Sequence, residues 1–491
     1  MKALLSSSTL SLLNEVVKPI GYDKEQASNG IVHIGIGAFH RAHQAVFTND
    51  LLKLDNHWKI TAVSLRSPKI RNEMSPQNSL YTVVERSNTG DEVSLIGAVE
   101  NVLVAPENPQ SVIDAIANQE TKVVTLTITE KGYCRDASGE HIDVNSQIVK
   151  DDLLTPHSPK TFAGFIVAAC NLRRKSGDKL TIISCDNLPS NGRITQTIVL
   201  EFANLLDPEL AHWIKDNVSF CNSMVDRIVP ATTADDIAQV SELIGVIDNC
   251  TVITEPFKQW VIEDDFVNEK PAWDSVGAMF VKNIEVFEEM KLRLLNGAHS
   301  CLAYVGFMKG HKFIHQAVND DICLALTKAL HKDLLSTLDN VPSIDLAVYA
   351  QTILSRFANE KVLYKTSQVA CDGSQKLPQR LFKPALELLE TGHVSKSIAL
   401  VIAVWIKFLM EKDHQGASFT VIDPIADKLR KLVKKYQNTP VDQIKAILTL
   451  CSTTGELLAS SDVFISQVVK SLEVLNNGTI DDAIECALRH G

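Results

Sequence analysis

The sequence predicts an α/β domain with a parallel sheet, followed by a mostly α-helical domain. In the first half, short and continuously apolar runs have the composition of strands that are buried on both faces. These runs alternate with helix-like stretches, as they do in βαβ units. After about residue 280 the strand-like runs nearly vanish and long amphipathic stretches follow. Because 491 residues exceed the size of one ordinary domain, we expect two domains, at residues 1–280 and 281–491.

The individual elements follow from the length and period of these runs. The expected strands of the first half are 31–36, 59–65, 122–128 and 179–185, with helices at 41–54 and 159–176, and residues 252–262 are expected to close this half. The expected helices of the second half are 285–308, 320–338, 345–357, 381–391, 394–410, 424–436, 441–451 and 462–475.

Composition and charge exclude some classes of protein. The net charge of −11 argues against nucleic-acid binding, because no excess of basic residues is present to neutralise phosphates. No apolar run is as long as a membrane span, and residues 1–16 lack the apolar core of a signal peptide. We therefore expect a cytoplasmic protein that acts on a small molecule, as a monomer or a small homo-oligomer.

The ten cysteines indicate reduced thiols rather than a metal site. None belongs to a C-x-x-C pair, and most lie in apolar runs, as buried free thiols do. A zinc site needs clustered Cys, His and carboxylate ligands, and the sequence contains no such cluster. His40 and His43 have near-helical spacing but no accompanying carboxylate, so we expect them to pack or to bind a cofactor. The sequence predicts no bound metal.

A glycine-rich segment directly after the first expected strand has the features of a phosphate-binding loop. Gly35 and Gly37 of I-G-I-G-A-F-H-R allow a tight turn and a close approach of the backbone to a pyrophosphate. His40 replaces the third glycine of the usual pattern, so an ordinary glycine turn is the alternative. The position between a strand and a helix favours the phosphate loop. The expected cofactor-binding residues here are Ile34, Gly35, Ile36, Gly37, Ala38, Phe39, His40 and Arg41.

The end of the second expected strand leaves the form of the cofactor open. In dinucleotide-binding folds an acidic residue at this point holds the adenosine ribose. Here residues 64–68 read S-L-R-S-P, without an acid, and Arg66 could face a 2′-phosphate instead. NAD is the expected cofactor, and NADP stays an open alternative.

One helix of the second half has the residue types of an alcohol dehydrogenase site. At about 100° per residue, and with Lys291 as zero, Glu288 falls near 60°, His299 near 80° and Asn296 near 140°. A lysine with a lowered pKa can take the hydroxyl proton, and an asparagine can donate a hydrogen bond to the reacting oxygen. The alternative is a solvated charged face, against which the apolar neighbours of Asn296 and His299 argue.

Two further polar clusters are candidate sites. Residues 184–187 (SCDN) lie at the carboxyl end of an expected strand, where ligands bind in doubly wound sheets. Asp226 and Arg227 form the other cluster, for which a buried structural ion pair is an equally good interpretation.

Several motifs together resemble the long-chain mannitol dehydrogenase family. They are GAFHRAHQA (37–45), TEKGY (129–133), SCDN (184–187), MVDRIVP (224–230), EPFKQWVIED (255–264), K-x-x-x-x-N-x-x-H (291–299) and DGSQKLPQR (372–380). The first six occur in the family's order between residues 31 and 300. The resemblance implies a Rossmann-type N-terminal domain, a mostly helical C-terminal domain, and catalysis without metal in the cleft between them.

The resemblance also implies roles for individual residues. Lys291 is expected to be the general base, and Asn187 and Asn296 are expected to form the oxyanion hole. The other residues that it implies are His299, which orients the substrate, Asp226 in the active site, Glu288, which relays the proton to water, and Glu130 of TEKGY at the cofactor.

The substrate follows less directly from the resemblance. The motifs at 255–264 and 372–380 most resemble fructuronate reductases, which interconvert D-fructuronate and D-mannonate. The alternative is a mannitol 2-dehydrogenase, which interconverts D-mannitol and D-fructose. Ala298 replaces an expected serine, Cys371 replaces an expected methionine, and residues 65–67 differ from the uronate enzymes. These departures concern the substrate and not the chemistry.

Lys376 and Arg380 are the candidate substrate-binding cations. They lie four residues apart, so in a helix they would share a face. One of them, with Lys376 the better candidate, is expected to bind a sugar hydroxyl or carboxylate. The alternative is a solvated basic face.

Proteins of other classes fit the sequence less well. A nucleotide-binding regulator would not need the lysine, both asparagines and the histidine. A short-chain dehydrogenase needs Y-x-x-x-K, which is absent, and a zinc alcohol dehydrogenase needs metal ligands. The sequence therefore predicts a NAD(P)-dependent oxidoreductase of carbohydrate metabolism that acts on the CH–OH group of an open-chain sugar derivative.

Overall fold

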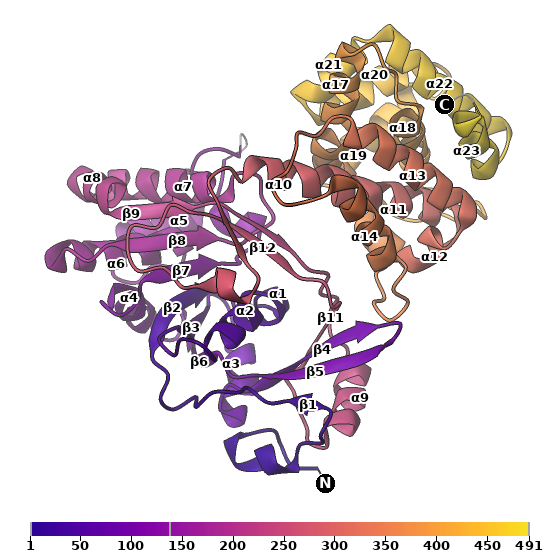
Figure 1. The fold of residues 1–491 in the computed structure, drawn as a ribbon. Coiled ribbons are helices and arrows are strands. Elements are labelled where there is room, and N and C mark those ends of the chain that lie inside the picture. The colour runs from indigo at the N-terminus through magenta and orange to yellow at the C-terminus, as the bar shows by residue number, and fades with distance from the viewer. Residues whose placement is uncertain (1, 137–138, 490–491) are drawn as a thin grey trace. The chain divides into compact units, whose positions relative to one another are not determined.

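The computed structural model describes residues 2–136 and 139–489. The chain consists of two compact units, Met1–Glu285 and Val286–Gly491. Every strand from β1 to β13 lies in the first unit, whereas the second unit is built from helices (Figure 1). The expected order, an α/β domain followed by a helical domain, is confirmed.

The first unit is organised around a parallel sheet of six strands. These strands are β2 (Asn29–Ile34), β3 (Lys59–Ser64), β6 (Val99–Val104), β7 (Val123–Leu126), β8 (Leu180–Ser184) and β9 (Val218–Cys221). Their order across the sheet is β6-β3-β2-β7-β8-β9, and every neighbouring pair is parallel. Numbered along the chain, this is the 3-2-1-4-5-6 order of dinucleotide-binding folds, which bind ligand where the order reverses. The reversal lies at β2, which leads into the glycine loop.

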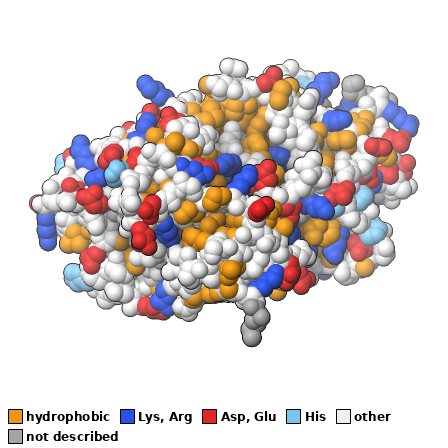
Figure 2. All heavy atoms as spheres, turned by 60° about the horizontal axis from the view of Figure 1, so that its bottom comes forward, with side chains coloured by type: hydrophobic (Ala, Val, Ile, Leu, Met, Phe, Trp, Pro, Cys, Tyr) orange, Lys and Arg blue, Asp and Glu red, His pale blue; other side chains and the backbone are white. Residues whose placement is uncertain are grey.

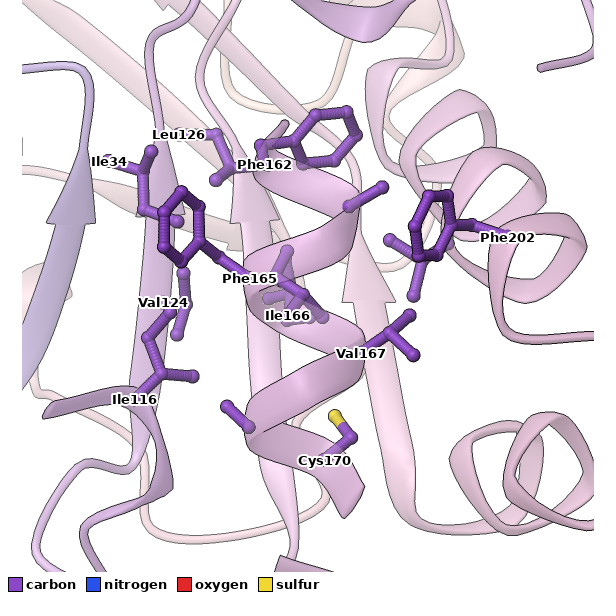
Figure 3. Close-up of a cluster of buried hydrophobic side chains, with 14 of the residues drawn as sticks. Ile34, Ile116, Val124, Leu126, Phe162, Phe165, Ile166, Val167, Cys170 and Phe202 are labelled. Atoms are coloured by element: carbon purple, nitrogen blue, oxygen red, sulfur yellow. The ribbon is translucent and has the colours of Figure 1, made fainter. Parts of the chain in front are cut away.

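Apolar side chains cover both faces of this sheet, which is why its strands are continuously apolar in sequence. On one face α4 (Pro109–Ala117), α6 (Phe162–Ser176), α7 (Asn191–Leu206) and α8 (Pro208–Asn217) form a single buried cluster with the strands. Figure 3 shows Phe165 of α6 reaching toward Ile34 and Val124 of the sheet. On the other face α2 (Gln44–Leu51) packs with Ile31 and Ile60.

Two smaller sheets complete the first unit. One has the order β1-β5-β4-β11 and the other β10-β12-β13. Their strands are β1 (Val17–Lys18), β4 (Tyr81–Ser87), β5 (Gly90–Ile96), β11 (Val252–Thr254), β10 (Ser223–Asp226), β12 (Gln259–Glu263) and β13 (Met279–Val281). The stretch 252–262, expected to close the first half, contains two strands, because β11 and β12 belong to different sheets. Pro256, which has no N–H to donate, lies between them.

The predicted helix 41–54 is also interrupted. It begins earlier, as α1 (Ala38–Ala42), and breaks at His43, whose φ and ψ are −125° and −88°, before α2 starts. The strands predicted at 31–36, 59–65, 122–128 and 179–185 correspond to β2, β3, β7 and β8, and the helix predicted at 159–176 corresponds to α6.

The second unit packs its helices around α18 (Lys396–Phe408), which is buried along most of its length. The other helices of at least eight residues are α11 (Ala298–Lys309), α13 (Asp321–Leu335), α14 (Leu346–Phe357), α17 (Lys383–Glu390), α19 (Ala426–Lys435), α20 (Pro440–Cys451), α22 (Asp462–Asn477) and α23 (Ile480–Leu488). The stretch predicted as one helix over 285–308 consists of α10 (Glu285–Met290), a π-helical segment η5 (Lys291–Gly297) and α11.

The helices of the described chain are too short or too polar for any of them to cross a bilayer. Figure 2 shows acidic and basic side chains interspersed on the face it draws. This mixture fits a chain with 59 acidic and 48 basic residues.

Candidate active site

The two glycines of the loop after β2 have different physical roles. Gly35 has a φ of +103°, and a Cβ there would lie 2.1 Å from the carbonyl oxygen of Thr127. Gly35 is therefore required for the approach of the loop to the end of β7. Gly37 is exposed, and a Cβ there would meet only the Gly35 carbonyl oxygen, at 3.9 Å. The space over Gly37 is open, as close approach of a pyrophosphate to the backbone requires.

Several loop side chains expected at the cofactor point into the protein instead. His40 is fully buried and stacks on His33, with ring centroids 3.3 Å apart. His43 is buried against Phe39, and its Nε2 lies 2.9 Å from the Gln259 carbonyl oxygen. Burial holds the pKa of His40 well below its usual value and lowers the pKa of His43 to about 3. Both rings are therefore neutral and serve packing.

Ile34 and Arg41 also serve packing. The Ile34 side chain lies in the core cluster between the sheet and α6. The Arg41 guanidinium donates to the Cys250 carbonyl and lies over the ring of Tyr81, whose hydroxyl donates to the Arg41 carbonyl at 2.8 Å. Of this loop, only main-chain atoms and the partly exposed Ala38 and Phe39 side chains fit the expected contact with a cofactor.

The TEKGY and SCDN motifs meet at the carboxyl ends of β7 and β8. The Asp186 carboxylate accepts hydrogen bonds from the backbone N–H groups of Ile128 and Thr129, at 3.0 and 2.8 Å, and from the Tyr133 hydroxyl, at 2.8 Å. Burial raises the pKa of Asp186, and the nearby charge of Glu130 adds to this effect. Asp186 is thus an anchor, whereas the next residue, Asn187, is exposed at the end of the sheet where ligands bind.

The end of β3 carries a positive charge and no acid. Arg66 is exposed there, and the turn that follows is closed by a hydrogen bond from the Ser64 hydroxyl to the Ser67 carbonyl, at 2.7 Å. The next acid along the chain is Glu73, which lies 4.0 Å from Lys69. This position therefore lacks the carboxylate that binds the ribose of NAD in many dinucleotide-binding folds.

Asp226 and Arg227 are neighbours in the sequence but have different surroundings in the structure. The Arg227 side chain is fully buried and forms an ion pair with Glu85 and hydrogen bonds with the carbonyls of Ala42 and Glu255. Its structural ion pair is therefore with Glu85. Asp226 ends β10 at 4% exposure, and its charge acts on the buried His43.

The candidate catalytic residues of the second unit lie on and around the π-helical segment η5. Lys291 and Glu288 are partly buried, whereas Asn296 and His299 are 8% and 9% exposed. The α-helical geometry assumed from the sequence is wrong here, because i→i+5 hydrogen bonding replaces the i→i+4 pattern. π-Helical turns within α-helices are rare and are frequent at functional sites.

Two aromatic rings hold His299 in place. Its imidazole stacks on Phe357 and on Tyr364, with centroids 4.9 and 5.1 Å away and interplanar angles of 26° and 22°. Neither aromatic residue was identified from the sequence, because both are more than 50 positions away along the chain. Nothing in a single sequence connects them with the histidine.

Lys376 and Arg380 lie in helical segments of different winding, rather than in one α-helical turn as the sequence suggested. Lys376 lies in α16 (Gly373–Leu377), and its ammonium donates to the carbonyls of Cys371 and Val369, at 2.7 and 3.4 Å. Arg380 lies in a second π-helical segment, η6 (Pro378–Phe382), and its Nη1 donates to the Asn296 carbonyl at 3.2 Å. The helix changes its winding between the two cations.

The described residues include one group that could in principle hold a metal ion. Ligand atoms of His311, Asp320 and Cys323 lie within 4.8 Å of one another. The Lys309 ammonium, however, lies 2.7 Å from Asp320 Oδ2, where a cation would bind. Although burial opposes it, this lysine holds the pKa of Asp320 well below its usual value, and burial raises the pKa of the Cys323 thiol. The group fits an ion-pair network that caps α13 better than a metal site.

Comparison with known proteins covers nearly the whole chain. Residues 29–275 match the family model of the mannitol dehydrogenase Rossmann domain, and residues 283–476 match that of the mannitol dehydrogenase C-terminal domain. D-mannonate oxidoreductase of Escherichia coli is 40% identical over 468 residues, which is 94% of this chain and 96% of that protein. Mannitol 2-dehydrogenase of Neosartorya fischeri is 33% identical over 487 residues, or 95% of this chain and 96% of that protein.

A solved structure of a mannitol dehydrogenase also matches this chain. Pseudomonas fluorescens mannitol 2-dehydrogenase, in a ternary complex with NAD and D-mannitol, matches with a TM-score of 0.88 and 37% identity, over 99% of this chain and 100% of that one. The resemblance inferred from the motifs is confirmed, and so is the Rossmann-type domain, whose fold fits the expected nicotinamide cofactor. The chain therefore belongs to the mannitol dehydrogenase family and is an oxidoreductase of that family.

Proposed function

We propose that this enzyme interconverts D-fructuronate and D-mannonate with NAD(H) and without a metal ion. The observation that carries the proposal is the 40% identity to a D-mannonate oxidoreductase across 94% of the chain. The polar set on the helix around η5 supports the reaction class, because it supplies a lysine, an asparagine and a histidine in partly or fully buried positions.

The proposed proton transfer depends on Lys291. As the neutral amine, Lys291 takes the proton of the C–OH group during oxidation and returns it during reduction. Glu288, one turn earlier on the helix, is proposed to pass this proton to water. NAD(H), held at the backbone around Gly37, would supply the hydride chemistry at the same carbon.

The proposed stabilisation of the reacting oxygen comes from two amides. Asn187 and Asn296 donate hydrogen bonds to the oxygen as it changes between alcohol and carbonyl. His299, fixed between Phe357 and Tyr364, orients the substrate. Asp226 is proposed to belong to the same site.

We propose residues 1–280 as the dinucleotide-binding domain and residues 281–491 as the substrate and catalytic domain. The backbone around Gly37 would hold the pyrophosphate, with Ala38 and Phe39 beside it. Glu130 and Arg66 would contact other parts of the cofactor, and both are exposed beyond the carboxyl ends of sheet strands.

Lys376 is the proposed cation for the substrate carboxylate. A carboxylate held by a lysine gains a charge-assisted hydrogen bond that a neutral ketose cannot form. The competing substrate pair is D-mannitol and D-fructose, which the 37% identity to a mannitol 2-dehydrogenase favours.

A side-by-side reduction assay separates the two substrate pairs. NADH oxidation is measured with D-fructuronate, D-tagaturonate and D-fructose, and the products are identified by chromatography. We expect D-fructuronate to have the highest kcat/KM and to give D-mannonate. A higher kcat/KM for D-fructose would replace the uronate proposal by the mannitol 2-dehydrogenase one, and turnover of none of the three would refute both.

A further inference from the structure

The segments α10, η5 and α11 follow one another without a break and form the catalytic helix, which carries Lys291, Asn296 and His299. The π-helical winding of η5 changes which residues of this helix lie together. In an α-helix, residues five apart are separated by about 140° around the axis. In a π-helix the i→i+5 hydrogen bond makes residues five apart neighbours along one side, as residues four apart are in an α-helix. Lys291 and Asn296 are five apart and lie within η5. The winding therefore brings the proposed base and the proposed oxyanion donor to the same side of the helix.

Side chains from outside η5 bind the carbonyl groups of this segment. The Leu294 carbonyl accepts from His331 Nε2 at 2.9 Å, and the Asn296 carbonyl accepts from Arg380 Nη1 at 3.2 Å. Because a carbonyl oxygen only accepts, Nε2 of His331 carries a proton, and burial lowers the pKa of this histidine so that it stays neutral. Such donors compensate for a local departure from the regular i→i+4 ladder.

Arg380 makes further contacts with the same helix. Its Nη1 also donates to the hydroxyl of Ser300, at 3.0 Å, one turn beyond Asn296. Its own π-helical segment, η6, packs on η5. A Cβ at Gly297 would lie 3.5 Å from the Arg380 carbonyl oxygen and 3.2 Å from Leu334 Cδ1, so Gly297 allows this close approach.

A second arginine anchors η5 from within. Arg293 is 2% exposed, and its guanidinium binds both carboxylate oxygens of Glu387, on α17, at 2.5 and 2.9 Å. It also donates to the Thr337 carbonyl at 2.6 Å. Arg293 thus ties η5 to its neighbours, whereas Arg380 is the arginine that binds at Asn296 itself.

We propose that Arg380 is a positioning residue that acts through Asn296. By binding the Asn296 carbonyl and the Ser300 hydroxyl, it keeps the segment π-wound and holds the Asn296 amide on the side of Lys291. This inference rests on the proposed roles of Lys291 and Asn296, but not on the identity of the sugar. It assigns Arg380 to the geometry of the catalytic helix rather than to the substrate carboxylate.

A double-mutant cycle tests the proposal. We expect Arg380→Ala to lower kcat by about 10- to 100-fold, the scale of a small misplacement of a reacting group, with the KM of charged and neutral substrates changed by less than about threefold. In an Asn296→Ala background, which keeps the main-chain carbonyl, adding Arg380→Ala should lower kcat by less than about threefold further. Arg380→Lys should recover part of kcat, because an ammonium can still donate.

Lys383→Ala is the matched control. Lys383 is an exposed cation three residues after Arg380, and it pairs at 2.6 Å with Glu289 of α10, so its loss removes a nearby charge without removing a donor to Asn296. We expect its kcat to stay within about twofold of wild type. Thermal melts establish that each variant is folded, and if Arg380→Ala is not, Arg380→Lys is carried through the same cycle.

Two outcomes would overturn the positioning role. If Arg380→Ala lowered kcat by the same factor with and without Asn296→Ala, Arg380 would not act through Asn296. A rise in KM confined to anionic substrates would mean that Arg380 binds the substrate carboxylate. The proposed function fails in a different way, when Asn296→Ala alone leaves kcat intact. The positioning role then fails with it.

Discussion

The cofactor loop of the first unit and the catalytic helix of the second use their motif residues in opposite ways. In the loop, the side chains of Ile34, His40 and Arg41 point into the protein, and exposed backbone is left for the ligand. In the helix, the motif side chains carry the proposed chemistry, and buried backbone carbonyls are bound by other side chains. A motif residue can therefore identify a family while serving either the ligand or the fold.

The largest expected effect separates the two regions. Lys291→Ala should lower kcat by about 10³- to 10⁴-fold, because the general base is lost. The Kd for NADH, measured by fluorescence titration, should stay within about twofold, because the cofactor loop belongs to the first unit. Retained turnover, or an equal loss of cofactor binding, would contradict the assignment of Lys291.

The next effect concerns the two amides. Asn187→Ala and Asn296→Ala should each lower kcat by about 10²- to 10³-fold, the usual cost of one oxyanion donor. If both amides act on one oxygen, the double variant should lose less than the product of the single losses. The kcat of the three variants is measured by steady-state kinetics. A loss of kcat in the double variant equal to the product of the two single losses would mean that the amides do not share an oxygen.

The two glycines give a smaller and opposite pair of effects. Gly35→Ala should lower the free energy of unfolding by about 2–3 kcal/mol, because its positive φ and the Thr127 carbonyl both oppose a side chain. Gly37→Ala should leave stability nearly unchanged and raise the Kd for NADH about tenfold, because its Cβ would lie where the pyrophosphate approaches. Denaturant melts and titrations measure both, and the reverse pattern would exchange the roles of the two glycines.

Arg66 gives a selective effect. Arg66→Ala should raise the Kd for NADP⁺ about tenfold and that for NAD⁺ by less than about twofold, because only NADP⁺ has a 2′-phosphate for the guanidinium. Lys175→Ala, which removes an exposed cation in the last turn of α6, is the control for net charge. Equal changes for both nucleotides in calorimetric titrations would remove Arg66 from the ribose site.

Removal of metal ions is expected to have no effect on activity. Activity should survive exhaustive treatment with EDTA, because Lys291 and the amides supply the chemistry and the Lys309 ammonium pairs with the same Asp320 oxygen that His311 contacts. Loss of activity that zinc restores would replace the lysine mechanism by one that uses a metal.

The parallel sheet could be predicted from the sequence because its strands are buried on both faces and are therefore continuously apolar. The β4–β5 hairpin was missed because β4 mixes buried with partly buried residues and β5 mixes buried with exposed ones. The break at His43 was missed for another reason, since it depends on partners such as Gln259, more than 200 residues away.

The residue types of the catalytic helix could also be predicted, but their geometry could not. The sequence has helical periodicity from Glu288 to His299, and no local signal marks the change to π winding. That change involves contacts with Arg380 and His331, which lie on other helices. The aromatic pair around His299 is equally distant in sequence. Tertiary contacts, rather than propensity, therefore set the geometry of this site.

The most direct test of the division between the two regions is the rate of hydride transfer in a single turnover, followed by NADH absorbance. The rate is measured for Gly37→Ala and for Lys291→Ala at increasing cofactor concentration, with saturating substrate. We predict that Gly37→Ala approaches the wild-type rate once cofactor saturates, whereas Lys291→Ala stays slow at every concentration. A Lys291→Ala variant that reaches the wild-type rate at high cofactor concentration would contradict the assignment of proton transfer to the catalytic helix.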